Sequence, residues 1–140
     1  MNQPFIHEHR VSYADCTLGN HIYHARYLDL LEVARGALFR HLGRTFLQYQ
    51  EQGLVFPVIE ARLTYKAPAR YDDVIAIETW PTLAEGLRLN FAYRIIRPVD
   101  KVIILEGFTF HVCTNLEEKP RRLPAELTAL LQPLIGPLAT

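Results

Sequence analysis

Two kinds of hydrophobic spacing divide the chain into a helical part and a strand-rich part. From residue 22 to about residue 42, apolar side chains recur with the period of an α-helix and widen beyond one stripe, and Gly43 follows as a stop signal. Strand-like runs occupy residues 5–14, 54–68, 73–80, 86–98 and 101–115. A helix that is apolar on most sides has to be surrounded by other elements, so we expect the strands to cover it.

Smaller features refine this pattern. Residues 45–52 form a short predicted helix that ends at Gly53, and residues 123–136 form another that is broken at Pro133. Pro57 predicts that the second strand lies at an edge of the sheet or is bent. Gly107, inside the last strand, predicts the close approach of another element, which we expect to be the long helix.

The order of elements predicts the fold class. One strand, one long helix and four strands joined by short turns indicate an α+β protein, in which an antiparallel five-stranded sheet wraps around one long central helix. No linker or internal repeat interrupts the chain, so residues 1–140 are expected to be a single domain. Exposed sheet edges and apolar surface predict self-association.

Composition excludes several classes of function. Hydrophobic residues make up 49% of the chain, and 15 basic residues balance 15 acidic ones, so no positive excess is available for nucleic acid. We expect neither a signal peptide at the N-terminus nor a membrane span. Cys16 and Cys113 are too few for a disulfide scaffold and are expected to be free thiols in the reducing cytoplasm.

Candidate chemistry concentrates at the junction before the long helix, in the stretch YADCTLGNHIYHARYLD. Asp15, Thr17 and Asn20 either cap the helix or belong to a reaction site, and the two roles are compatible. The first turn of a helix has unpaired amides and the positive end of the helix dipole, here around Tyr23 and His24. Such amides can stabilise negative charge that develops in a transition state.

Two histidines and one arginine near or on the long helix each have a possible site role and a simpler structural one. His21 and His24 have a spacing that could bind a metal, but no third ligand is evident, and we expect no metal. Arg35 lies on the apolar helix face and must be paired, with Glu32 as the candidate, or open onto a cleft. It lies roughly 16 Å along the helix from His24. A joint role would require a neighbouring subunit or a substrate that spans this distance.

Several motifs occur together in the order of a known family. They are Tyr13, Asp15, GNHIYHARYL at 19–28, Glu32, Ala34-Arg35, APARYDD at 67–73, GFTFHVC at 107–113 and KPRRLP at 119–124. With these motifs, residues 7–124 resemble the hotdog-fold acyl-CoA thioesterases of the 4-hydroxybenzoyl-CoA thioesterase-like family. The resemblance implies a hotdog fold and hydrolysis of an acyl thioester whose thiol is coenzyme A or the phosphopantetheine arm of a carrier protein. It also implies a homodimer or homotetramer, a pocket between subunits, and no cofactor beyond the coenzyme A of the substrate.

One position departs from the family pattern. Family members usually carry a catalytic carboxylate where this chain has Thr17, two residues after Asp15. A threonine hydroxyl is not a base at neutral pH. In a related polyketide-type branch asparagine occupies this position, and activity is ascribed to an oriented water with an arginine and a tyrosine of the helix. Arg35 and Tyr27 match these two residues. Amides at the start of the helix would suit the thioester oxygen whatever side chain stands at position 17.

The resemblance also assigns roles to residues. The candidate catalytic residues are Asp15, Thr17, Tyr23, His24, Tyr27 and Arg35. Each basic residue of the strand ends and loops is expected to be a solvated surface group, but together they are candidates for binding the phosphates of coenzyme A: Lys66, Arg70, Arg88, Lys119, Arg121 and Arg122. Two alternatives stay open. One is dehydration or hydration of an acyl thioester by His24 with Asp15 or Glu60, and the other is non-catalytic binding of an acyl thioester.

Overall fold

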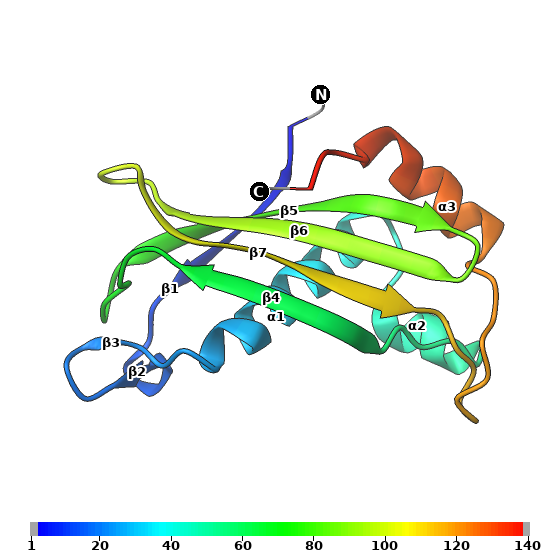
Figure 1. Ribbon diagram of the computed structural model, residues 1–140, viewed down its shortest axis with the longest axis horizontal. Helices are drawn as coiled ribbons and strands as arrows, with labels where there is room; N and C mark the ends of the chain where they lie inside the picture. The colour runs from blue at the N-terminus through cyan, green and yellow to red at the C-terminus, as the bar shows by residue number, and fades with distance from the viewer. Residues whose placement is uncertain (1–2, 139–140) are drawn as a thin grey trace.

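The computed structural model describes residues 3–138, in which one sheet lies across one long helix, α1, Arg26–His41 (Figure 1). The strands are β1 (Phe5–Arg10), β4 (Val58–Tyr65), β5 (Val74–Glu85), β6 (Arg88–Arg97) and β7 (Val102–Val112). Their order is β1-β5-β6-β7-β4, and all neighbours are antiparallel. The predicted α+β hotdog architecture, a five-stranded antiparallel sheet around one helix, is confirmed.

The position of β4 differs from the prediction that the last four strands are joined by short turns. β5, β6 and β7 follow one another as neighbours, but β4 lies at the far edge beside β7 although β5 follows it in the chain. Residues 66–73 therefore cross from one side of the sheet to the other, held by hydrogen bonds from the amides of Lys66 and Ala67 to the carbonyl of Ile104. The edge position predicted from Pro57 is confirmed.

The core lies between the sheet and α1. On β6 the alternation is regular, because Leu89, Phe91, Tyr93 and Ile95 are all buried. Leu87, which has the same parity and falls within the predicted strand run 86–98, is 37% exposed because it precedes the strand in a turn. The helix contributes buried residues at helical spacing: Tyr27, Leu30, Leu31, Ala34, Leu38 and Phe39. In the region 3–138 no helix is long and apolar enough to cross a lipid bilayer.

The start of α1 differs from the prediction. The helix begins at Arg26 rather than at residue 22, because His21–Ile22 form a short strand, β3, paired with β2, Cys16–Thr17. Gly19 and Asn20 make the turn of this hairpin with φ of 92° and 58°. The first strand also ends early, at Arg10, and Tyr13 begins a 3₁₀ turn, η1 (Tyr13–Asp15), with its side chain 83% exposed.

Gly107 marks a close approach, but the approaching element is not the helix. A Cβ atom at this position would lie 2.3 Å from the carbonyl oxygen of Arg62 in β4. The glycine is therefore required by the neighbouring strand. No atom of the helix that was expected there is among the atoms nearest to this position.

The shorter helices follow their predicted positions. α2 spans Phe46–Glu51 and is capped by the Thr45 hydroxyl, which accepts a hydrogen bond from the amide of Gln48. α3 spans Ala125–Leu131 and continues into a 3₁₀ turn, η2, at Gln132–Leu134. Cys16 and Cys113 are free thiols, as expected.

Candidate active site

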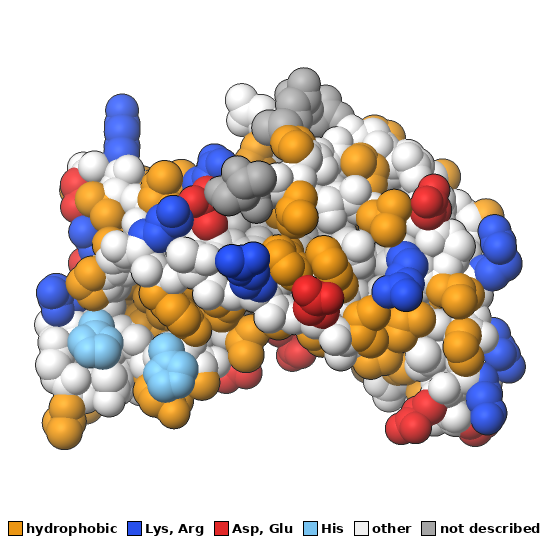
Figure 2. Space-filling model, viewed as in Figure 1, with side chains coloured by type: hydrophobic (Ala, Val, Ile, Leu, Met, Phe, Trp, Pro, Cys, Tyr) orange, Lys and Arg blue, Asp and Glu red, His pale blue; other side chains and the backbone are white. Residues whose placement is uncertain are grey.

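A pocket of about 580 Å³ lies where the β2–β3 hairpin, the start of α1 and the end of β4 meet. Its lining residues are Thr17, His21, Ile22, Tyr23, His24, Tyr27, Tyr65, Lys66, Ala67 and Pro68. Four of the six predicted catalytic residues are therefore together. In Figure 2 histidine side chains lie on the lobe that β2, β3 and the start of α1 form, beside a hollow in the molecular surface.

Tyrosine side chains form one wall of this pocket. The hydroxyl of Tyr65 donates a hydrogen bond to the carbonyl of His24 at 3.1 Å, and the Tyr27 and Tyr65 rings are in contact. Burial raises the pKa of Tyr27 to about 12. Tyr27 therefore keeps its proton near neutral pH and is available as a donor, not as a base.

The backbone at the start of α1 offers hydrogen-bond donors. The amide of Tyr23 is already used, because it donates to the carbonyl of Asp15 at 3.0 Å. Within residues 3–138 the amides of His24 and Ala25 have no acceptor. The free donors thus lie one residue further along the chain than the sequence indicated, at the positive end of the helix dipole.

Asp15 is buried beneath the pocket rather than lining it. Its carboxylate accepts hydrogen bonds from His9 (2.7 Å), Arg26 (2.8 Å) and the amide of Ser12 (2.9 Å). Burial alone raises its pKa, but these donors outweigh burial and lower the pKa to about 2. Of the two alternatives left open by the sequence, this geometry favours the structural one: Asp15 anchors the hairpin and the first turn of α1.

Thr17 is exposed in β2, opposite His21, and its side chain lines the pocket. No Asp or Glu is among the residues that line this pocket, and Glu60 lies elsewhere on β4. Among residues 3–138 there is also no group of three or more His, Cys, Asp and Glu side chains that could hold a metal ion. The pocket therefore lacks both a carboxylate base and a metal-binding cluster.

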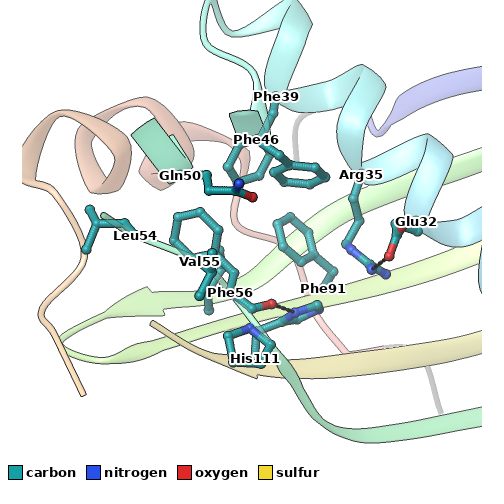
Figure 3. A pocket seen from close by; sticks show the side chains of 12 residues that line it. Glu32, Arg35, Phe39, Phe46, Gln50, Leu54, Val55, Phe56, Phe91 and His111 are labelled. Atoms are coloured by element: carbon teal, nitrogen blue, oxygen red, sulfur yellow. Dashed lines mark hydrogen bonds and ion pairs between the residues drawn. The ribbon is translucent and has the colours of Figure 1, made fainter. Parts of the chain in front are cut away.

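Arg35 lies in a different pocket, lined by the second half of α1, by α2 and by residues 54–57 before β4 (Figure 3). It is buried, donates from Nη1 to the hydroxyl of Tyr93 at 3.0 Å, and approaches the carboxylate of Glu32 to 3.9 Å. The predicted pairing with Glu32 is thus present. Within one chain, however, Arg35 does not share a pocket with Thr17 or His24.

His111 is a polar group that the sequence interpretation left without a role. It is buried beside this second pocket, with Nδ1 2.9 Å from the carbonyl of Phe56 and Nε2 2.8 Å from the hydroxyl of Thr109. Burial, with the nearby charge of Arg35, lowers its pKa to about 4. The alternation of β7 in the sequence indicates that His111 is buried, because position 111 falls on the inward face with Leu105 and Thr109.

The six predicted phosphate-binding residues fall into two groups at opposite ends of β7. Lys66 lines the first pocket, and Arg70 donates to the carbonyl of Asn20 in the hairpin turn. The other group lies near the far end of the strand: Arg88, Lys119, Arg121 and Arg122. Tyr65 is opposite Leu105 and Arg88 is opposite Val112, so the groups are about 23 Å apart at 3.3 Å per residue.

Comparison with known proteins places this geometry in a family. The model of the thioesterase superfamily matches residues 19–104. The acyl-CoA thioester hydrolase YbgC of Escherichia coli is 34% identical over 121 residues, which are 86% of this chain and 90% of that protein. The putative acyl-CoA thioesterase YneP of Bacillus subtilis is 30% identical over 110 residues, 79% of each chain. The crystal structure of a hypothetical protein from Thermus thermophilus superposes with a TM-score of 0.85 at 31% identity, covering 92% of this chain and 98% of that one.

The anchoring role of Asp15 predicts a specific dependence of stability on pH. Its pKa is lowered from 3.8 to about 2, so its contribution is complete above about pH 4 and is lost as the pH falls towards 2. Asp15→Asn is expected to lower the free energy of unfolding at pH 7 by about 2 kcal/mol. It should also reduce the acid limb, the fall in the free energy of unfolding between about pH 4 and pH 2. Urea unfolding between pH 2 and 7 measures both effects.

Asp72→Asn is the matched control, because Asp72 makes an exposed ion pair with Arg10 at 3.4 Å. It should change the free energy of unfolding by less than about 1 kcal/mol. An Asp15→Asn protein with an unchanged acid limb would contradict the anchoring role.

Proposed function

The chain belongs to the thioesterase superfamily, and we propose that it hydrolyses acyl-CoA thioesters to a free acid and coenzyme A. The observation that carries the proposal is the pocket at the start of α1, which His24 lines with polar side chains around it, and where the amides of His24 and of the adjacent Ala25 are unpaired. Water adds to the thioester carbonyl carbon, and the carbon–sulfur bond then breaks. One proton of the water passes to the leaving thiolate, so the products are a carboxylic acid and a thiol.

We assign the steps of this reaction to residues of the first pocket. The amides of His24 and Ala25 receive the carbonyl oxygen as it gains negative charge. Histidine is the side-chain type that accepts a proton near neutral pH, and His24 is the residue we assign to the attacking water. Thr17 positions this water or the acyl group. Tyr27, which retains its proton, is available as a further donor to the substrate.

The same pocket disfavours dehydration or hydration. That chemistry would pair His24 with an acid, but the carboxylate of Asp15 is fully engaged by His9, Ser12 and Arg26, and Glu60 does not line the pocket. Hydrolysis requires only water and a place for negative charge on the carbonyl oxygen. It is therefore the reaction that these residues support best.

We propose that Lys66 and Arg70 hold phosphates of coenzyme A, because Lys66 lines the pocket and Arg70 contacts the adjacent hairpin turn, whereas Arg88 and its neighbours serve a second site or none. Lys66→Gln is expected to weaken inhibition by coenzyme A by up to about fivefold, the range for one exposed charge contact. The effect should shrink as salt rises, because charges are screened beyond about 10 Å at 0.1 M. Inhibition constants at two salt concentrations measure this, with Arg88→Gln as control. Equal effects of both substitutions would contradict the assignment.

We also propose that the chain forms a homodimer, and from it a homotetramer. In β4 every residue except Leu63 is exposed, although the strand includes Val58, Ile59 and Tyr65. An edge strand that is uncovered on both faces is a ready site for a second copy. Sedimentation at micromolar concentration is expected to give a mass of at least twice 16.1 kDa. A folded species at the monomer mass would contradict the proposal.

Thr17 provides the sharpest test of the mechanism. If it positions water, Thr17→Ala should lower kcat roughly tenfold, equivalent to about 1.4 kcal/mol. Thr17→Asp installs the carboxylate that the pocket lacks and should raise kcat, because a general base contributes about 10² or more. Thiol release from one accepted acyl-CoA compares the three proteins.

Two other outcomes identify the rival accounts. Complete loss in Thr17→Ala, with an acyl group trapped on the wild-type threonine by rapid quenching, would mean a nucleophilic Thr17. An inactive wild type that Thr17→Asp makes active would mean that the natural chain binds acyl thioesters without hydrolysing them.

A further inference from the structure

The pocket beside Arg35 has a volume of about 330 Å³ and is not used by the reaction described above. Phenylalanine rings form much of its wall: Phe39, Phe46, Phe56 and Phe91 (Figure 3). A cavity of about 150 Å³ is large enough to hold benzene, so this pocket admits an apolar group of substantial size. Its buried polar side chains are Arg35 and His111.

A chain of hydrogen bonds fixes these two side chains. The carbonyl of Phe56 can only accept, so Nδ1 of His111 carries the proton and Nε2 of the neutral ring accepts from Thr109. The hydroxyl of Thr109 then accepts from Tyr93 (2.6 Å), whose oxygen accepts from Nη1 of Arg35 (3.0 Å). The direction of every bond is determined. His111 therefore has no donor left for an occupant of the pocket, and Arg35 is held in place.

Arg35 retains hydrogen-bond donors that nothing in the described residues accepts from, and its charge is compensated only by the distant ion pair with Glu32. Its other N–H groups donate to no acceptor within residues 3–138, and they are not among the fully enclosed unpaired atoms, so they are accessible from the pocket. The carboxylate of Glu32 is 3.9 Å from Nη2, beyond hydrogen-bond distance, and its side chain is 73% exposed. A buried guanidinium that is so weakly compensated is complementary to an anionic oxygen.

Strand β4 and the segment before it contribute to the walls of both pockets. Phe56 and Pro57, just before β4, line the second pocket, whereas Tyr65, at the end of β4, lines the first. Between them the inward-facing residues of β4 are incompletely covered, since Ala61 is exposed and Leu63 is only partly buried against the core. The roughly 14 Å from Arg26, where α1 begins, to Arg35 is a distance that an extended acyl chain can span.

Building on the thioesterase activity proposed above, we propose that the second pocket receives the far end of the acyl group and that Arg35 binds a carboxylate there. The preferred substrates are mono-coenzyme A thioesters of long dicarboxylic acids. The apolar body of such an acyl group packs along α1 and β4, while its terminal carboxylate accepts hydrogen bonds from Arg35. Glu32 competes weakly for the same guanidinium and opposes the binding of an anion.

Matched pairs of substrates test this inference. Dodecanedioyl-CoA should be hydrolysed with a kcat/KM at least about tenfold above that of dodecanoyl-CoA, the value for one hydrogen-bonded charge pair. The short pair, succinyl-CoA and butyryl-CoA, should show no such preference, because the carboxylate cannot reach Arg35. Equal kcat/KM values for the long pair, or the same preference in the short pair, would overturn the inference and leave the proposed hydrolysis intact.

Two substitutions separate recognition of the carboxylate from catalysis. Arg35→Met should remove the preference for dodecanedioyl-CoA, whereas Glu32→Gln should increase it, because a competing negative charge is lost. If Arg35→Met instead slows both long substrates equally, Arg35 acts at the thioester, across a subunit interface, and the inference is wrong. The Glu32→Gln result keeps the test decisive if Arg35→Met does not fold.

Binding provides a readout that is independent of turnover. Thioether analogues of the long pair, which cannot be hydrolysed, should differ in Kd by the same factor of about ten in calorimetry. A chain that binds the dicarboxylate analogue more tightly but hydrolyses no acyl-CoA would support the pocket and contradict the proposed function. Equal Kd values for the two analogues would overturn the pocket assignment.

Discussion

The burial of α1 is the constraint on which the rest of the structure depends. A helix with Leu31, Ala34 and Leu38 at its centre has to be covered, and five strands supply the cover. The cover is thinnest at β4, where Leu63 is the one residue of the strand that is partly buried. One pocket lies at the first turn of the helix and another beside its second half.

One buried charged side chain lies near the first turn of the helix and another lies beside its second half, and the two differ in how fully they are paired. At the first turn, Asp15 is satisfied by three donors from β1, the segment after it and α1, so its charge serves the fold. Beside the second half of the helix, Arg35 has one firm partner, Tyr93, and faces a pocket. A buried charge that is fully paired stabilises a unique arrangement, whereas one that is partly paired retains the capacity to bind an ion of opposite sign. The contacts of Asp15 therefore support its anchoring role, and those of Arg35 support the proposal that it binds an anion.

Much of this fold was predictable from sequence because it follows from regular patterns. The alternation of β6 and the helical spacing of α1 report burial directly, and both were predicted correctly except at Leu87 and Leu28, which are exposed. The hairpin that displaces the helix start to Arg26 was not, since two-residue strands have no periodicity to detect and depend on the positive φ of Gly19 and Asn20. The neighbour of Gly107 was also assigned wrongly, because a glycine reports a close approach without naming the element that approaches.

For the candidate site, sequence could group residues that are near in the chain but not those joined by the fold. Thr17, Tyr23, His24 and Tyr27 fall within eleven positions, and the structure puts them around one pocket. The contribution of Tyr65 and the connection from Arg35 through Tyr93 and Thr109 to His111 depend on strand pairing, which local patterns do not specify. The same limit applies to Asp15. Its side chain was a plausible site group until its three partners, nearby in sequence but oriented by the turn, were seen to enclose it.

In the mechanism that we propose, a threonine at position 17 in place of the family's usual carboxylate affects only one component of catalysis. Proton transfer by a positioned base typically contributes about 10²- to 10⁴-fold, and this component is weakened when a hydroxyl stands in the pocket. Stabilisation of the oxyanion by fixed donors contributes a further 10²- to 10³-fold or so for each donor. This second component here depends on the backbone of His24 and Ala25, whose positions are set by the Asp15 anchor and the first turn of α1. Because the anchor lies outside the pocket and the amides belong to no side chain, the substitution at position 17 leaves both intact. The proposed mechanism therefore retains the electrostatic part of thioester hydrolysis and uses His24, rather than a carboxylate, as the base.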